Sequence, residues 1–272
     1  MISTILQMFT YPFLVNALVV GILVSLCSSL LGVSLVLKRY SMIGDGLSHV
    51  GFASLAVAYA MNAAPLVVAI PVCVIAAFLL LRMKDSSKIK GDAATALLCS
   101  GSLAIGVMTI SLTTGMNTDV CNYMFGSILA MSESDVKLSI LLSIVVLILY
   151  VFFYNKIFAV TFDETFTKAT GTRSDLYNML IALLTSVTVV LGMRMMGTLL
   201  ISSLIIFPSL ASMRICKRFK TVIVSSVAIS VLCFIAGIYM SFVYSTPTGA
   251  SIVIANLFVF IVFASIEKAK SR

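Results

Sequence analysis

The stretch PFLVNALVVGILVSLCSSLLGVSLV, residues 12–36, contains no charged side chain. About 20 apolar residues in helical form are enough to cross the hydrocarbon core of a bilayer. A helix suits such a run because it satisfies its own backbone hydrogen bonds where no water is available. This stretch therefore decides the fold class: it predicts a membrane-spanning helix.

Similar runs continue along the chain, which is 61% hydrophobic and only 10% charged, against about 25% charged residues in soluble domains. No hydrophilic stretch is long enough for a second domain, and the N-terminus lacks the basic flank of a cleaved signal peptide. We therefore predict a single all-α, polytopic membrane domain over residues 1–272. Nine runs are present, at about residues 12–36, 43–61, 64–82, 93–113, 136–154, 176–193, 196–214, 220–243 and 249–266. The splits at residues 62–65 and at Arg194 are the weakest, so eight or nine transmembrane helices are expected.

The net charge of +8 is explained by orientation in the bilayer, not by nucleic-acid binding. Sixteen of the 18 basic residues fall in the loops at 37–42, 82–92, 155–175 and 214–220 and in the C-terminal tail. Loops enriched in Lys and Arg face the cytoplasm. Only Lys137 and Arg194 fall on the opposite set, so nine spans would put the N-terminus outside and the C-terminus inside.

The next stretch, SMIGDGLSHVGFASLAVA (residues 41–58), carries the single histidine of the chain, His49, four residues after Asp45. Positions i and i+4 share one face of a helix, so the carboxylate and the imidazole would point at the same place. Such a pair suits Zn²⁺ or Mn²⁺, and ionisable residues inside membranes are functional candidates by default. Ser41 and Ser48 are candidates to complete the ligand shell. Two structural interpretations stay open: a carboxylate hydrogen-bonded to the ring, and a helix cap formed by Asp45.

Two loop segments have features of their own. The outer segment, residues 114–135, is too polar to span, and it predicts a short or re-entrant helix at about residues 123–129. Its acidic residues, Asp119, Glu133 and Asp135, are interpreted as solvated loop charges, with a cation-attracting mouth as the alternative. The inner segment, residues 155–175, predicts a short amphipathic helix that starts with acidic residues and is stopped by Gly171. Phe162 and Phe166 would share one face of that helix and could dock into a partner's groove.

The chain shows no motif for catalysis. It has no phosphate-binding loop of the G-x-x-x-x-G-K-[ST] type, no H-E-x-x-H and no G-x-S-x-G, so we expect a transport subunit, not an enzyme. The six cysteines form no C-x-x-C pair and are interpreted as small buried hydrophobic residues. Met193, Met195 and Met196 are interpreted as lipid-facing or core side chains, not as a soft-metal site.

Six stretches resemble, in their order and spacing, the membrane permease subunits of ATP-binding-cassette metal importers, the zinc, manganese and iron group. They are LVLKRYSMIGDGLSH (35–49), GDAATALLCSGSLAIG (91–106), YMFGSILAMS (123–132), FDETFTKATG (162–171), MGTLLISSLIIFPSLA (196–211) and PTGASIV (247–253). The chain departs from the family pattern at Thr95, where many members have Gly, and at Ser245, where many have an acidic residue.

The resemblance implies import of a divalent transition-metal ion across a bacterial plasma membrane, with zinc favoured and manganese or iron open. It implies a homodimer of permease chains, two cytoplasmic ATPase subunits and an extracytoplasmic metal-binding protein, with no permanently bound cofactor. The family's Gly-Asp-x-x-Ser-His motif maps its ligands onto Asp45 and His49. The family's coupling region maps onto Phe162, Asp163, Glu164, Phe166, Lys168 and Gly171.

Two rival functions remain at this point. A cation-coupled or proton-coupled secondary carrier would use Asp45 as a proton site and would need no ATPase. A non-transporting membrane scaffold would keep Asp45 and His49 as a structural pair.

Overall fold

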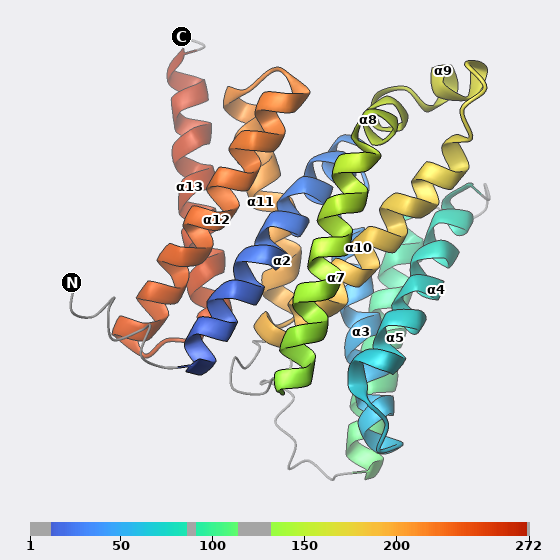
Figure 1. Cartoon of the computed structure of the whole chain (residues 1–272), viewed down its shortest axis with the longest axis vertical. Helices are drawn as coiled ribbons and strands as arrows, with labels where there is room; N and C mark the ends of the chain where they lie inside the picture. The colour runs from blue at the N-terminus through green and yellow to red at the C-terminus, as the bar shows by residue number, and fades with distance from the viewer. Residues whose placement is uncertain (1–11, 86–90, 114–131, 271–272) are drawn as a thin grey trace.

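The computed structural model describes residues 12–85, 91–113 and 132–270, and the regular structure in these ranges is helical throughout (Figure 1). Nine long helices account for most of them: α2 (Pro12–Leu37), α3 (Ile43–Ala60), α4 (Pro65–Asp85), α5 (Gly91–Thr113), α7 (Glu133–Phe152), α10 (Ser174–Met196), α11 (Thr198–Ile215), α12 (Phe219–Tyr244) and α13 (Thr248–Lys270). Two short helices, α8 (Tyr154–Phe162) and α9 (Glu164–Ala169), connect α7 to α10. The predicted outer helix at residues 123–129 and Asp119 lie outside the described residues.

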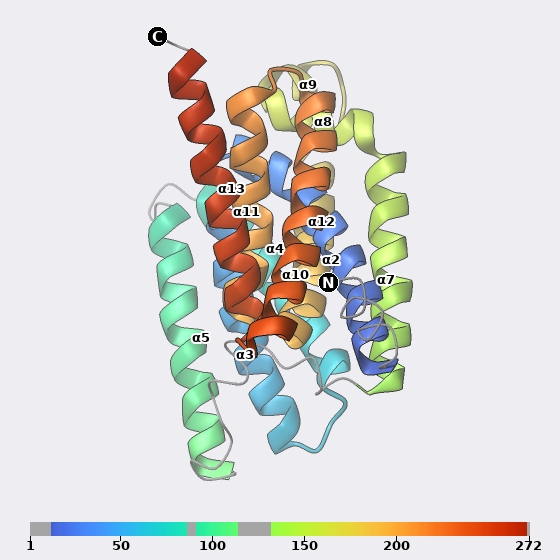
Figure 2. The ribbon, with the colours of Figure 1, turned by 90° about the vertical axis from the view of Figure 1, so that its left-hand side faces the viewer.

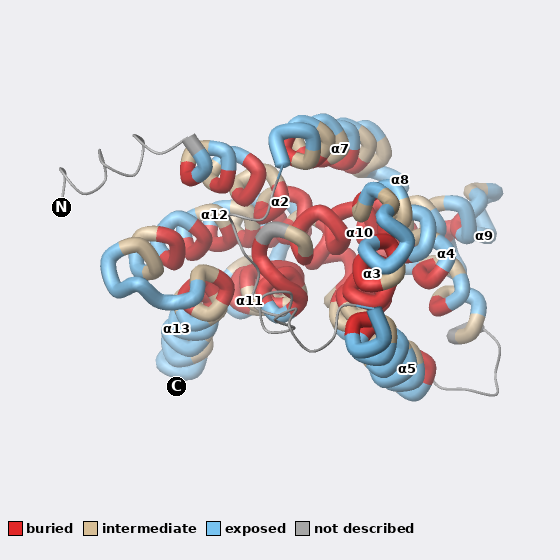
Figure 3. Tube along the Cα trace, turned by 90° about the horizontal axis from the view of Figure 1, so that it is seen from below, coloured by how far each residue is buried: buried red, intermediate tan, exposed pale blue. Residues whose placement is uncertain are grey.

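Eight of the long helices in the described ranges are long and apolar enough to cross a membrane. The ninth, α3, has a similar length but carries Asp45, His49 and several glycines and serines, which lower its hydropathy. Thirteen of its 18 residues are buried in the bundle, so other helices, not lipid, form most of its surroundings (Figure 3). Both uncertain splits are therefore real helix boundaries, and eight of the nine long helices in the described ranges qualify as spans, α3 being the exception.

The bundle surrounds α2, α10 and α11, while α5, α7 and α13 lie at its periphery with exposed outward faces (Figures 2 and 3). Buried serines join the central helices. The Ser230 hydroxyl of α12 donates to the Ser25 carbonyl of α2 at 3.1 Å, and Ser209 of α11 lies 3.4 Å from Ser226. Small hydroxyl residues allow close helix approach where no hydrophobic force drives association in lipid. The ends of α2, α4, α11 and α13, where the basic residues gather, lie at the same end of the bundle as α8 and α9 (Figure 1), in agreement with the predicted orientation.

Several helices end in the way that the turn residues indicate. Helix α3 ends at a left-handed Asn62, with φ 53°, inside the predicted split at residues 62–65. Helix α9 ends at Gly171, with φ 80°, as predicted. The split placed at Arg194 is wrong by three residues, because Arg194 belongs to the last turn of α10 and the chain reverses at Gly197, with φ 86° and ψ 165°.

Helix α5 packs closely on α3 because Gly106 presents no side chain there. A Cβ atom at Gly106 would lie 2.5 Å from Cε1 of Phe52 and 3.2 Å from Cα of Ala53. The Phe52 side chain is among the largest fully buried ones, so its ring has little room to move away. The small-residue spacing of Ser102 and Gly106 thus marks a real helix contact at Gly106.

Asp135 is not a solvated loop charge, contrary to the sequence-based interpretation. It lies in the first turn of α7, where it and Ser132 form a capping box. Its Oδ2 atom also accepts a hydrogen bond of 2.7 Å from Nη2 of Arg194, and these side chains are only 14% and 11% exposed. A buried carboxylate needs such a partner, and the partner comes from α10, which sequence spacing could not indicate.

We predict that Gly106→Ala destabilises the purified protein by about 1–3 kcal/mol, the usual cost of overpacking a filled contact. The matched control is Gly101→Ala in the same helix, where a Cβ would meet nothing within 4 Å. This control should be neutral or slightly stabilising, because alanine favours helix over glycine by about 0.5–1 kcal/mol. Thermal unfolding in detergent compares the two, and equal midpoints would contradict the packing argument.

We also predict that Asp135→Asn lowers stability by about 3–5 kcal/mol, because it leaves the Arg194 guanidinium buried without its counter-charge. Glu133→Gln removes a charge from the same helical turn, but Glu133 is exposed, so it should change the thermal midpoint little. If Glu133→Gln lowered the thermal midpoint as much as Asp135→Asn does, the loss of any negative charge at this end of α7 would explain the effect, and the ion pair would not be needed.

Candidate metal centre

The turn between α2 and α3 positions the first turn of α3. The Tyr40 amide donates to the Leu35 carbonyl at 2.8 Å and the Arg39 amide to the Val36 carbonyl at 3.0 Å, which is the Schellman pattern of helix ends. Arg39 takes the left-handed position of that motif, with φ 59°, where glycine is the usual residue. The chain then reverses and α3 begins at Ile43, so Asp45 falls in its first turn.

Asp45 does not cap α3. Met42 holds the N-cap position and makes no side-chain hydrogen bond there. The Asp45 carboxylate is one-third exposed, with a side-chain exposure of 34%, and it is left available for other partners. The capping interpretation is therefore wrong.

Asp45 and His49 lie together, as their spacing predicts, but they do not form a hydrogen bond. The distance from Asp45 Oδ1 to His49 Nε2 is 4.0 Å, which is beyond hydrogen-bond length. The other ring nitrogen, Nδ1, is buried and has no hydrogen-bond partner among the described residues. The structural-pair interpretation thus lacks the hydrogen bond on which it depends. The imidazole nitrogens remain able to bind another partner.

Two further side chains from neighbouring helices contact Asp45. The Ser202 hydroxyl of α11 lies 3.3 Å from Asp45 Oδ1. The Cys99 thiol of α5 lies 3.9 Å from Asp45 Oδ2. Asp45, His49 and Cys99 each offer one ligand atom, and these three atoms lie within 4.8 Å of one another. Three helices thus meet at one polar cluster.

The two predicted helper residues have different surroundings. Ser48 is fully buried and its hydroxyl donates to the Asp45 carbonyl at 2.7 Å, so it supports the helix backbone in this structure. Ser41 lines a cavity of about 550 Å³ together with Arg39, Met42, Thr95 and Cys99. This cavity borders the cluster at Cys99 and offers room for water around an ion.

The spacing of the cluster suits a divalent ion as cargo. Ligand bonds to Zn²⁺ are about 2.0–2.3 Å long, so two tetrahedral ligands lie about 3.3–3.6 Å apart. His49 Nε2 lies 4.0 Å from Asp45 Oδ1 and Cys99 Sγ lies 3.9 Å from Asp45 Oδ2, and each of these separations exceeds the zinc value by about half an ångström. At 4.0 Å the Asp45 and His49 side chains form no hydrogen bond, so a contraction to the zinc value breaks none between them.

The cluster lies well inside the bundle. Asp45 is in the first turn of α3, and Ser202 is one turn from the start of α11. The two helices run in opposite directions, with α3 extending toward the lower end and α11 toward the upper end (Figures 1 and 2). Their first turns therefore meet part-way along the bundle, and the two helices extend from there in opposite directions.

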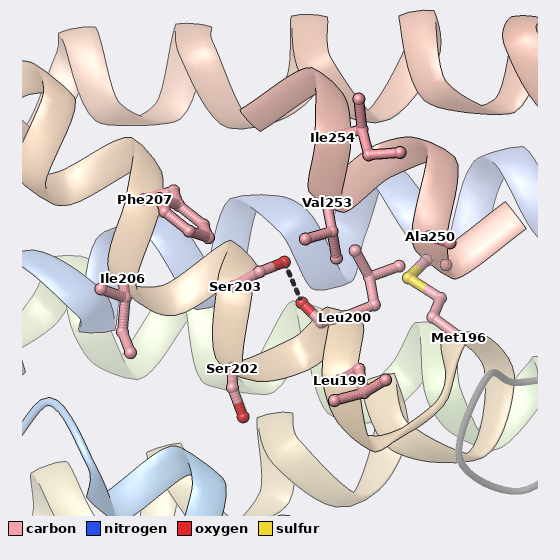
Figure 4. Close-up of a pocket in the computed structure, with 11 residues that line it drawn as sticks. Met196, Leu199, Leu200, Ser202, Ser203, Ile206, Phe207, Ala250, Val253 and Ile254 are labelled. Carbon is pink, nitrogen blue, oxygen red and sulfur yellow. Dashed lines mark hydrogen bonds between the residues drawn. The ribbon is translucent and has the colours of Figure 1, made fainter. Parts of the chain in front are cut away.

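A second cavity, of about 400 Å³, lies between α11 and α13 (Figure 4). Its lining is apolar except for Ser202 and Ser203, and no charged or imidazole side chain contributes. The Ser203 hydroxyl is occupied by the Leu200 carbonyl at 2.8 Å, while Ser202 points to the other side of α11 (Figure 4). This cavity has no ligands for a hydrated divalent ion.

The predicted inner helix is present as α9, which begins after Asp163 and ends before Gly171, and a further short helix, α8, precedes it. Asp163 has extended backbone angles and its Oδ1 accepts the Phe166 amide at 2.8 Å, so it ends α8 and caps α9. The prediction that Phe162 and Phe166 share a face is therefore wrong. Phe162 is the last residue of α8 and packs on Phe158 and Phe219, while Phe166 belongs to α9, and both side chains are largely exposed, at 59% and 66%.

Charged residues tie α9 to the bundle. Glu164 lies 3.6 Å from Lys38 and 3.2 Å from Lys168, and Lys168 lies 3.1 Å from Asp175. Lys38 also donates to the Asn178 side chain of α10. Partial burial would raise the pKa of Glu164, but hydrogen bonds from Asn178 and Lys168 and the nearby lysine charges outweigh it and hold this pKa below its ordinary value. Glu164 therefore stays ionised and anchors α9 beside the end of α2.

Cys99 is the site residue that sequence reasoning missed. The interpretation of the cysteines as buried hydrophobic residues is confirmed for Cys27, Cys73 and Cys233, and Cys121 lies outside the described residues. Met193 and Met196 are buried in the core, as expected. The sequence offered one signal for Cys99, which is that it lies in the G-D-A-A-T-A-L-L-C-S stretch that resembles the family. Its contact with Asp45 arises only from the packing of α5 on α3, which the sequence does not show.

Known proteins show the same architecture. The chain is 28% identical to the manganese transport system membrane protein MntC of Halalkalibacterium halodurans, over 91% of this chain and 85% of that protein. It is 26% identical to the high-affinity zinc uptake system membrane protein ZnuB of Haemophilus influenzae, over 92% and 96%. In structure it is similar to PsaBC from Streptococcus pneumoniae, solved in complex with Fab, with a TM-score of 0.87, 26% identity and coverage of 97% and 95%.

The family model described as the ABC 3 transport family matches residues 10–267, nearly the whole chain. The all-helical bundle, the membrane-length helices and the absence of a phosphate-binding loop from the sequence agree with a permease whose ATP hydrolysis belongs to a separate subunit. The chain therefore belongs to the ABC 3 transport family, as its multi-pass membrane subunit.

Proposed function

We propose that this chain imports a divalent transition-metal ion across a bacterial plasma membrane, using Asp45 and His49 as ligands on the ion path. The observation that carries the proposal is the pair itself. A carboxylate and an imidazole face each other at 4.0 Å without a hydrogen bond, at side-chain exposures of 34% and 18%, on a helix that apolar helices enclose. Ionisable groups are costly in such a place and mark substrate paths.

The partners follow from the family and from the shape of the cytoplasmic end. An ABC permease needs an ATPase, and α8 and α9 form a projecting elbow on the end where the basic loops gather (Figure 1). Phe166 offers an exposed aromatic anchor on this elbow. A second copy of the permease and an extracytoplasmic metal-binding protein complete the proposed importer, and lipid contacts the exposed apolar faces of the outer helices.

The cargo belongs to the transition metals and not to Mg²⁺ or Ca²⁺. Imidazole nitrogen is a ligand for zinc, manganese and iron, whereas the hard cations prefer all-oxygen shells. Relatives with 26–28% identity have names that mention manganese or zinc, which supports the class of ion without distinguishing its members. The ion leaves as readily as it enters because the two ligands do not close a four-coordinate shell.

We predict that His49→Ala reduces metal accumulation by about tenfold or more, since even the loss of outer-shell support costs 10–100-fold in metal affinity. The measurement is cellular zinc, manganese and iron content in a strain without its own importers. That strain expresses the chain with its ATPase and binding protein. Asp45→Asn should behave in the same way.

The matched control is Ser54→Ala, which alters a buried residue of the same helix whose hydroxyl is tied to the Gly51 carbonyl. It should transport normally. Normal transport by His49→Ala would refute the ligand assignment. Transport without the ATPase would favour a secondary carrier, and an intact complex that moves no metal would favour a scaffold.

We predict that Phe166→Ala weakens association with the ATPase by roughly 30-fold, the equivalent of the ~2 kcal/mol typical of an interface anchor. Phe258→Ala is the control, because Phe258 is equally exposed, at 67% against 66%, but lies on α13. Co-purification and titration with the ATPase compare the two variants. Equal affinity for both would show that α9 is not the docking element.

A further inference from the structure

Cys99 contributes a thiol, a soft sulfur ligand, to the cluster of Asp45 and His49. It comes from α5, while Asp45 and His49 come from α3. Its Sγ atom lies 3.9 Å from Asp45 Oδ2, and the ligand atoms of all three residues lie within 4.8 Å of one another. Cys99 carries the only thiol in the described residues whose sulfur lies in a group with a carboxylate and an imidazole.

We propose that Cys99 is a third protein ligand for the transported ion, so that the site holds one oxygen, one nitrogen and one sulfur atom. This inference rests on the proposed function of Asp45 and His49 and extends it to the choice of ion. Thiolate sulfur favours Zn²⁺ strongly over Mn²⁺, which prefers oxygen ligands. The site therefore selects thiophilic divalent ions, with Zn²⁺ first among those that the relatives' names mention.

The packing of α5 on α3 brings the thiol within reach. Gly46 follows Asp45 and faces α5, where a Cβ atom would lie 3.0 Å from Cγ2 of Thr95 and 3.9 Å from Cys99 Sγ. A larger residue at Gly46 would push α5 away and take Cys99 with it. Gly106 maintains the same contact further along α5. Two glycines on opposite helices therefore hold the sulfur at its distance from Asp45.

Three protein ligands leave one position of a tetrahedral shell open, the arrangement of zinc sites that exchange a fourth ligand. The cavity beside Cys99, lined by Ser41, Arg39 and Thr95 among others, adjoins this open position. When the ion binds, the thiol proton passes to water in that cavity and the sulfur coordinates as thiolate. Ser202, at 3.3 Å from Asp45 Oδ1, donates to the carboxylate and orients it, as outer-shell groups do.

The direct test uses Co²⁺ as a spectroscopic probe for the purified complex of the chain with its ATPase. Thiolate bound to Co²⁺ gives a sulfur-to-metal charge-transfer absorption in the near ultraviolet, which oxygen and nitrogen ligands do not give. We expect this band in the wild type and its loss in Cys99→Ser. The control is Cys216→Ser, at the half-exposed end of α11 away from the cluster, which should keep the band.

A transport assay then tests the sulfur ligand Cys99 separately from the metal path through Asp45 and His49. Cys99→Ser should lower zinc uptake by about tenfold or more while manganese uptake changes much less, because serine keeps a hard oxygen and loses the sulfur. Unchanged zinc uptake in Cys99→Ser together with a loss in His49→Ala would overturn the sulfur ligand and leave the metal path intact. Unchanged uptake in both variants would overturn the proposed site as a whole. A Co²⁺ band that persists in Cys99→Ser would also overturn the sulfur ligand.

Discussion

The structure depends on the cost of placing a carboxylate and an imidazole on a helix inside an apolar bundle. Neither group can face lipid, because an ionisable side chain there costs several kcal/mol or more. Helix α3 therefore needs protein on nearly all sides, and α2, α4, α5, α10 and α11 all contact it or lie against its neighbours. The polar helix is the one most enclosed, and the apolar helices around it carry the surface that meets lipid.

Enclosing α3 requires close helix contacts, and these are made by small residues instead of bulky ones. Gly106 lets α5 approach Phe52, buried serines of α12 donate to backbone carbonyls of α2, and Ser209 of α11 pairs with Ser226 of α12. In lipid such contacts replace the hydrophobic drive that holds soluble cores together. The same contacts set the geometry of the cluster, because each of its side chains projects from a helix whose depth and rotation they determine.

Much of the fold can be predicted from the sequence because each membrane-spanning helix is marked by its own long apolar run. The run at residues 12–36 becomes α2 almost to the residue, and Gly171 ends α9 as expected. What could not be predicted depends on tertiary contact. The Asp135–Arg194 pair joins α7 to α10, and Cys99 reaches Asp45 only across the α3–α5 interface. The predicted shared face of Phe162 and Phe166 was wrong for a different reason: Asp163 caps α9 and separates it from α8, and the i, i+4 spacing of the two phenylalanines cannot show such a break.

The elbow formed by α8 and α9 and the cluster around Asp45 are connected by a short path through the end of α2. Glu164 of α9 pairs with Lys38, and Lys38 also contacts Asn178 of α10. The chain then turns through the left-handed Arg39 and enters α3, where Asp45 lies seven residues after Lys38. Lys38 thus ties α9 and α10 to the turn at which α2 ends and α3 begins. Asp45 stands in the first turn of α3 beyond that turn, where Cys99 and Ser202 from two other helices reach it.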